Sequence, residues 1–246
     1  MFTLRILSIV LLCFCCISHA SNSLDYKAAN QKVVAIDIGH SKHRWGATSS
    51  RGVGEYWFNH AVAKVLHEKL NKAMIDVVII NDHGNDISLK QRVSEINRSN
   101  ASLLVSIHHD SVQPKYLNKW EFQRNVNIYC DIFSGFSIFV SKKNVHYSKS
   151  LNLANIIGSN FIHTGLEPSL HHSEPIEGES RELLSSHLGI YNANFAVLSQ
   201  SNISSVLVEC GIILNRYDEL KLGNLEYQTK IAEALSASVI SYLENY

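Results

Sequence analysis

Four residues whose types could carry chemistry each follow an apolar run or a glycine-rich turn. They are His40, Glu55, His108 and Glu209. Two imidazoles and one carboxylate, with a further position open, are a common ligand set for catalytic zinc. Such an ion polarises a carbonyl and lowers the pKa of bound water to about 7, and a second carboxylate can then act as general base and acid. The set predicts metal-assisted hydrolysis.

Each of these residues taken alone has an ordinary explanation. A single histidine at a strand end is more often a hydrogen-bonded structural residue, and Glu55 suits the first turn of a helix because of the helix dipole. Glu209 is harder to explain, since it directly follows the apolar run 205–208. A carboxylate buried there needs a metal, a cation or strong hydrogen-bond donors. The four residues together favour a functional site.

The periods of the apolar residues indicate the elements that must position this set. Strands are expected at 33–37, 76–80, 102–107, 136–140, 195–198 and 206–208, and helices from Glu55, after Ser88, over 150–163 and over 227–243. Because the two kinds of element alternate, we expect an α/β fold: a single domain with a mixed, mostly parallel six-stranded sheet flanked by helices. Ligands of such sheets gather beyond the carboxyl ends of the strands. His40, His108 and Glu209 are expected there.

Two long segments, 111–134 and 165–194, show no clear period. Loops of this length in a compact domain are usually functional or disordered, and the aromatic content favours ordered walls of a substrate site. The second segment contains Glu174, Glu177, Glu179 and Arg181, for which a solvated acidic loop is the plain alternative. The neighbouring pair His171-His172 is interpreted as exposed polar residues. Arg92 is expected on the polar face of its helix.

The first twenty residues have the pattern of a secretory signal. Arg5 precedes the apolar run 6–17, and small residues lead to Ala20, after which cleavage is expected. An uncleaved anchor is the alternative. The prediction is an exported protein, periplasmic or secreted, with no stable membrane span after cleavage. The catalytic domain then covers 21–246, with its core at about 32–246.

Cysteines and charges narrow the class of protein further. Three of the five cysteines lie in the predicted signal, which leaves Cys130 and Cys210. Export permits a disulfide between them, whereas Cys210 also suits a buried free thiol, so both states stay open. Lys plus Arg and Asp plus Glu each total 22, so no net field indicates a nucleic-acid partner.

In these motifs the sequence resembles the zinc-dependent N-acetylmuramoyl-L-alanine amidases of bacterial cell walls (amidase type 3). The matching segments are IDIGH (36–40), GVGE (52–55), LLVSIHHD (103–110), SGFSIFVS (134–141) and SSVLVECGIILN (204–215). The resemblance implies Zn²⁺ ligation by His40, Glu55 and His108, a catalytic carboxylate at Glu209, and peptidoglycan as the substrate. A zinc peptidase or amidase acting on another peptide, or a silent wall-binding module, are the alternatives.

The chain departs from the family pattern at three positions. Ile38 stands where a proline is common, Ser41 where a second glycine is common, and His109 where a small residue usually follows the SIH histidine. Because side chains alternate along a strand, only one of His108 and His109 can face the site, and we favour His108.

The resemblance also gives the acidic segment two functional interpretations. In regulated members an inserted helix can place a glutamate on the zinc until a protein activator displaces it, a role open to Glu174, Glu177 or Glu179. Alternatively, Glu179 and Arg181 could contact the peptide stem of the substrate, with Arg181 pairing a carboxylate in bidentate fashion.

Overall fold

The candidate residues lie on, or directly next to, the strands of a seven-stranded mixed sheet. In the computed structural model, which describes residues 32–245, the strand order is β2-β1-β3-β9-β6-β8-β7. The strands β2, β1, β3 and β9 pair in parallel, whereas β6 runs antiparallel to β9, and β7 antiparallel to β8. Their bounds are β1 Val33–Ile38, β2 Asp76–Ile80, β3 Leu103–Asp110, β6 Ser137–Val140, β7 Glu182–Ser185, β8 Ile190–Asn192 and β9 Ser204–Ile212.

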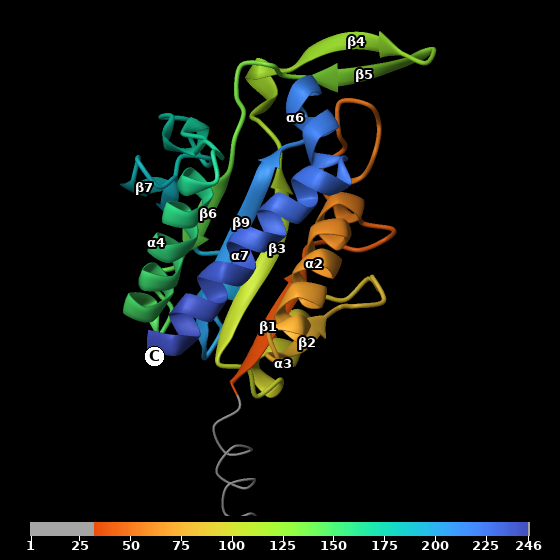
Figure 1. Cartoon of the computed structure of the whole chain (residues 1–246). Helices are drawn as coiled ribbons and strands as arrows, with labels where there is room; N and C mark the ends of the chain where they lie inside the picture. The colour runs from red at the N-terminus through yellow and green to blue at the C-terminus, as the bar shows by residue number, and fades with distance from the viewer. Residues whose placement is uncertain (1–31, 246) are drawn as a thin grey trace, which may run out of the picture. The chain divides into compact units, whose positions relative to one another are not determined.

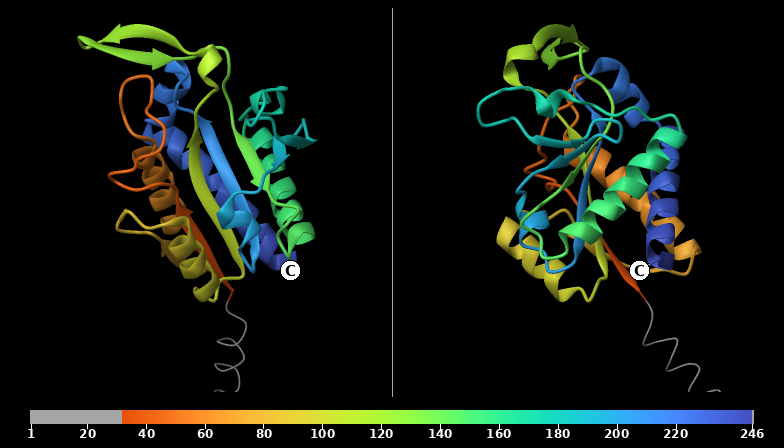
Figure 2. Two further views of the ribbon diagram at one scale, coloured as in Figure 1. Left: turned by 180° about the vertical axis from the view of Figure 1, so that it is seen from behind. Right: turned by 90° about the vertical axis from the view of Figure 1, so that its left-hand side faces the viewer.

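Helices cover both faces of this sheet (Figures 1 and 2). On one face α2 (Glu55–Lys72), α4 (Tyr147–His163) and α7 (Leu225–Asn245) bury their apolar sides in the larger core, which Tyr56 and Phe161 help to fill. On the other face α3 (Leu89–Arg98) and the short α5 (Ala196–Ser199) pack in a second core. Both faces of the central strands are therefore buried from solvent, which agrees with their nearly continuous apolar sequences.

Local sequence signals fix the start of two helices beside the site. Ser88 accepts a hydrogen bond from the Gln91 amide, and the Gln91 side chain accepts one from the Ser88 amide, which is a capping box at the start of α3. Glu55 is the first residue of α2, where the helix dipole favours a carboxylate. The start of α2 lies against the carboxyl end of β3, where Glu55 contacts His108. In the first turns of α3, Arg92 contacts Asp37 and Ile38 at the carboxyl end of β1.

The predicted single α/β domain with a mixed sheet flanked by helices is confirmed, with seven strands in the sheet instead of six. The strand expected at 195–198 is wrong: this stretch is α5, where the Ser199 and Gln200 amides donate to the Phe195 and Ala196 carbonyls. A four-residue apolar run has no measurable period, so it cannot distinguish a buried strand from one buried helical turn.

The two segments without a clear period contain ordered structure. A β-hairpin of β4 (Asn118–Phe122) and β5 (Asn125–Tyr129) lies in the first and projects at one end of the sheet (Figure 1). The second contains the 3₁₀ turn η2 (His171–Ser173) together with β7 and β8. A short helix, α6 (Arg216–Leu222), follows β9.

Two further predictions concern the cysteines and the N-terminus. Cys130 and Cys210 are both free and buried, and they lie in different apolar clusters, so the alternative without a disulfide holds. The predicted signal lies outside the described residues. Within 32–245, no helix combines the length and apolar character needed to cross a membrane.

Candidate metal centre

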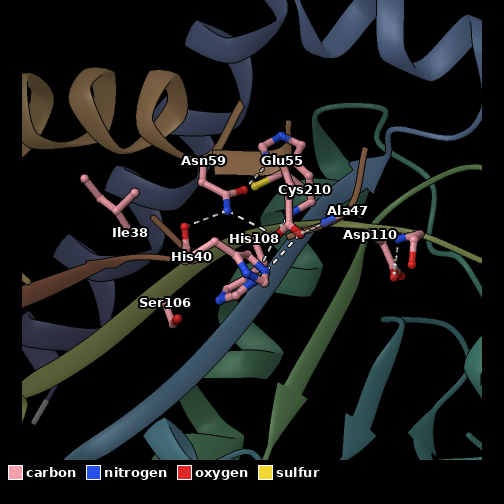
Figure 3. A network of polar contacts seen from close by, with 12 residues as sticks. Ile38, His40, Ala47, Glu55, Asn59, Ser106, His108, Asp110 and Cys210 are labelled. Carbon is pink, nitrogen blue, oxygen red and sulfur yellow. Dashed lines mark hydrogen bonds and ion pairs between the residues drawn. The ribbon is translucent and has the colours of Figure 1, made fainter. Parts of the chain in front are cut away.

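Three of the four predicted site residues converge at the carboxyl edge of the sheet. The Nε2 atom of His40 lies 2.9 Å from Glu55 Oε2, and the Nδ1 atom of His108 lies 3.0 Å from Glu55 Oε1. Their donor atoms all lie within 4.8 Å of one another. Figure 3 shows the two imidazoles and the carboxylate meeting from the loop after β1, the start of α2 and the end of β3.

His40 reaches this position through an unusual backbone conformation. Its φ angle is +66°, in the left-handed region that non-glycine residues rarely adopt. Its carbonyl accepts hydrogen bonds from Arg92 Nη2 at 2.7 Å and from Asn81 Nδ2 at 3.1 Å. Such strain persists where the surroundings over-determine it, often at functional sites.

Two glycines leave room for the converging side chains. A Cβ atom at Gly39 would lie 2.4 Å from the ring of His108. A Cβ atom at Gly46 would lie 2.3 Å from Glu55 Oε2 and 2.6 Å from the His40 ring. Any larger residue at either position would displace a candidate ligand.

Arg92 supports the same loop, contrary to the expectation of an exposed position. It is only 5% exposed, and its Nη1 donates to Asp37 Oδ1 at 2.5 Å and to the Ile38 carbonyl at 2.6 Å. The sequence could have indicated this contact through Asp37, because a carboxylate inside an apolar strand needs a cation or hydrogen-bond donors. Ser106 Oγ donates to the other Asp37 oxygen at 2.6 Å.

Glu55 is buried and surrounded by donors. Asn59 Nδ2 donates to Oε1 at 3.1 Å, and the Ala47 amide donates to Oε2 at 3.1 Å. Burial alone would raise the pKa of Glu55, but the hydrogen bonds and charges of His108 and His40 hold it well below its ordinary value. The carboxylate is therefore ionised and held in one orientation. Sequence reasoning missed Asn59, whose only signal is its position one helical turn after Glu55.

Glu209 lies beside this centre on the neighbouring strand. It is the register partner of His108 in the β3–β9 pair, so the two side chains share a face of the sheet. Its Oε2 atom is buried without a hydrogen-bond partner among the described residues. Burial raises the pKa of Glu209 well above its ordinary value, and the charges of Asp110 and Glu55 add to the effect. A cation nearby would reverse this trend.

The adjacent His109 has a different environment. It is buried, and its Nδ1 lies 2.8 Å from Asn59 Oδ1 and not against the Glu55 carboxylate. Burial lowers the pKa of His109 to about 3, so its ring is neutral. Asn59 thus contacts both the Glu55 carboxylate and the His109 ring.

A groove of about 430 Å³ exposes His40, His108 and Glu209 to solvent. Its walls come from the loop after β1, the start of α3 and the start of α5, with Arg44, Leu89 and Phe195 among the lining residues. The expected walls, 111–134 and 165–194, do not line this groove.

The structure does not bring the acidic segment to the three converging residues. Glu174 accepts a hydrogen bond from the Tyr116 hydroxyl and lies 3.8 Å from Lys115 Nζ. Arg181 donates to the Gly178 and Ser180 carbonyls. Glu179 is half-buried. A contact of these residues with substrate, or of a glutamate with a metal, stays a prediction.

The residues of the centre fit a divalent zinc ion. Two imidazoles and an ionised carboxylate meet there, the donor set that zinc prefers. Gly39 and Gly46 leave room for the donor atoms to converge, and Glu209 adds a buried oxygen that has no hydrogen-bond partner among the residues described. Asn59 and the Ala47 amide orient the carboxylate from outside, as the surroundings of metal ligands commonly do.

Comparisons with known proteins agree on one family. The sequence profile of the family described as N-acetylmuramoyl-L-alanine amidase matches residues 34–241. A putative N-acetylmuramoyl-L-alanine amidase of Buchnera aphidicola is 28% identical, over 85% of this chain and 93% of that protein. The amidase AmiA of Escherichia coli is 27% identical, over 88% of this chain and 78% of its own length. The crystal structure of an N-acetylmuramoyl-L-alanine amidase from Clostridium difficile superposes with a TM-score of 0.68 at 29% identity, covering 87% of this chain and 98% of that one.

Proposed function

Because the chain belongs to the N-acetylmuramoyl-L-alanine amidase family, we propose that it hydrolyses the amide bond between N-acetylmuramic acid and L-alanine in peptidoglycan. We propose further that His40, Glu55 and His108 hold a Zn²⁺ ion and that Glu209 is the catalytic carboxylate. One observation carries the assignment: the three donors converge beside a buried carboxylate oxygen that has no hydrogen-bond partner in the described part of the chain. This arrangement suits metal-assisted hydrolysis of an amide.

The chemistry divides between the ion and Glu209. When bound, Zn²⁺ polarises a carbonyl and makes water more acidic. Glu209 accepts a proton from the attacking water as the new C–O bond forms. It then donates that proton to the nitrogen of L-alanine as the C–N bond breaks, so the carboxylate is regenerated. The products are a free lactyl carboxylate on the sugar and a stem peptide with a free amine.

The surroundings of the site suit both roles. The ionised Glu55 offsets part of the charge of a dication, and its donors keep it from rotating. The buried position of Glu209 favours holding a proton until the amine leaves. The groove lined by Arg44, Leu89 and Phe195 gives the substrate access to both groups.

We propose that the protein is exported from the cytoplasm. Peptidoglycan lies outside the cytoplasm, which agrees with a signal at 1–20 and a periplasmic or secreted protein. A protein activator stays a prediction, with the segment around Glu174 as its expected point of action.

Removal of the metal is expected to abolish hydrolysis. After dialysis against a strong chelator, release of peptide from purified peptidoglycan should fall to background, because His40, Glu55 and His108 then hold no Lewis acid. Readdition of Zn²⁺ should restore the rate, whereas Mg²⁺ should not, since this donor set suits zinc. The control is chelator presaturated with Zn²⁺. Full activity of protein that contains no detectable metal would contradict the zinc assignment.

Replacing Asn59 by alanine is expected to weaken zinc binding by about 10–100-fold. The variant removes the side-chain donor at 3.1 Å from Glu55 Oε1, so the orientation of the carboxylate depends on backbone amides such as that of Ala47. Competition with a fluorescent zinc chelator measures the change. Asn71→Ala is the matched control, because Asn71 is exposed on the same helix, where it contacts His67. Equal zinc affinity of the two variants would show that Asn59 does not position Glu55.

A further inference from the structure

A second group of side chains that can bind a metal shares no residue with the first. Asp110 ends β3, and His171 with His172 forms the turn η2. The Oδ2 atom of Asp110 lies 2.7 Å from His172 Nε2 and 3.4 Å from His171 Nε2. The three donor atoms lie within 4.8 Å of one another. The sequence interpretation of His171-His172 as exposed polar residues is wrong for His171, whose side chain is 0% exposed.

One of these imidazoles has a buried nitrogen that makes no well-formed hydrogen bond within the described part of the chain. Among residues 32–245, buried His171 Nε2 meets no partner with the geometry of a hydrogen bond, although it lies 3.4 Å from Asp110 Oδ2. Its other nitrogen, Nδ1, lies 2.9 Å from the Ser169 hydroxyl. Metal-bound histidines use their two nitrogens in this way, one on the ion and the other on an oxygen. A buried polar atom without a partner otherwise costs about 1–3 kcal/mol.

The carboxylate is oriented in the same manner. The Ser111 amide donates to Asp110 Oδ1 at 2.8 Å, which leaves Oδ2 facing both imidazoles. The rings of His171 and His172 lie 3.9 Å apart, so protonating both would place two positive charges side by side. Phe133 packs on His171, and Phe139 packs on His172. This apolar surround limits solvent access and strengthens any charge interaction inside.

We propose that Asp110, His171 and His172 form a second site for a divalent transition-metal ion, for which Zn²⁺ is the expected occupant. Ligand atoms of tetrahedral zinc at 2.0–2.2 Å lie about 3.3–3.5 Å from one another. The His171–Asp110 distance already matches this value, and the His172–Asp110 distance needs to open by less than one ångström. Zinc accepts nitrogen and oxygen ligands together, whereas Mg²⁺ and Ca²⁺ prefer oxygen alone.

An ion at this site would fasten η2 to the end of β3. Few regular elements hold the chain between α4 and β7, where Glu174 and Arg181 lie. The ion would add a cross-link between this segment and the strand that carries His108. Its role is therefore to order the segment, and it does not depend on the proposed reaction.

Metal stoichiometry tests the second site directly. The full chain is saturated with Zn²⁺, passed through a desalting column and analysed by inductively coupled plasma mass spectrometry. Two ions per chain are expected in the wild type, and one in each of His172→Gln and His171→Asn. His187→Gln is the matched control, since His187 is exposed in the same part of the chain, and it should retain both ions. Circular dichroism is used to check that each variant is folded.

The result for His108→Ala separates the two sites. The second site would be overturned if the wild type binds a single ion, and if this ion is lost in His108→Ala but kept in His172→Gln. In that case the second ion is already missing from the wild type, so the result does not depend on whether a variant folds. A single ion that disappears in His172→Gln and persists in His108→Ala would support the second site and contradict the zinc centre of the proposed function. Two ions retained in both His172→Gln and His171→Asn would also overturn the second site.

Discussion

Glu209→Gln is expected to lower kcat for peptidoglycan hydrolysis by a factor of about 10²–10⁴, the usual contribution of a general acid–base group. Glutamine preserves the shape of the side chain but cannot accept the proton of water at Oε2, the buried atom that has no hydrogen-bond partner within 32–245. The variant should still bind zinc, because its metal ligands are intact. Removing a buried carboxylate should leave stability unchanged or raise it.

The control for this variant is Glu226→Gln, an exposed glutamate in the first turn of α7. Rates are measured from the release of dye-labelled peptidoglycan fragments, and zinc content is measured on the same samples. If Glu209→Gln retains zinc and hydrolyses at the wild-type rate, Glu209 does not transfer the proton. A fall in rate that merely follows loss of zinc would assign Glu209 to metal binding instead.

Arg92→Met is expected to lower the free energy of unfolding by about 3–5 kcal/mol, the usual effect of removing one partner of a buried ion pair. The guanidinium side chain is 6% exposed, and the Asp37 side chain, 1% exposed, would lose its cation. The carbonyls of Ile38 and His40 would lose donors in the same step. The strained conformation at His40 would then lose part of its support.

Urea unfolding of the metal-free protein measures this change without a contribution from zinc binding. Arg98→Met is the matched control, because Arg98 is exposed on the same helix and donates to the Ser94 carbonyl one turn earlier. That variant should change the free energy of unfolding by no more than about 0.5 kcal/mol. A loss below 1 kcal/mol in Arg92→Met would show that Asp37 does not depend on this partner.

The sequence predicted the elements that have a long period and the residues at their ends. β1, β3, β9 and α2 are marked by apolar runs or helical spacing, and the convergence of His40, Glu55 and His108 follows from parallel strands ending at one edge. Short elements were not predictable in this way. The strands β7 and β8 contain four and three residues, too few to show alternation.

The surroundings of the site were the harder part. Asn59, Arg92 and the pair His171-His172 act through contacts with residues far away along the chain, such as Arg92 with Asp37 and His172 with Asp110. Periodicity describes which face of an element is buried, but it does not show which polar residue finds a partner across the sheet. Asp37 indicated the need for a cation without indicating its source.

The most direct test of the central claim is to identify the bond that the protein cuts. Purified peptidoglycan is digested, and the soluble products are analysed by mass spectrometry, with Glu209→Gln as the blank. We expect stem peptides with a free L-alanine amine and glycan strands whose muramic acid carries a free lactyl carboxylate. Products cleaved within the peptide, with L-alanine still joined to muramic acid, would contradict it.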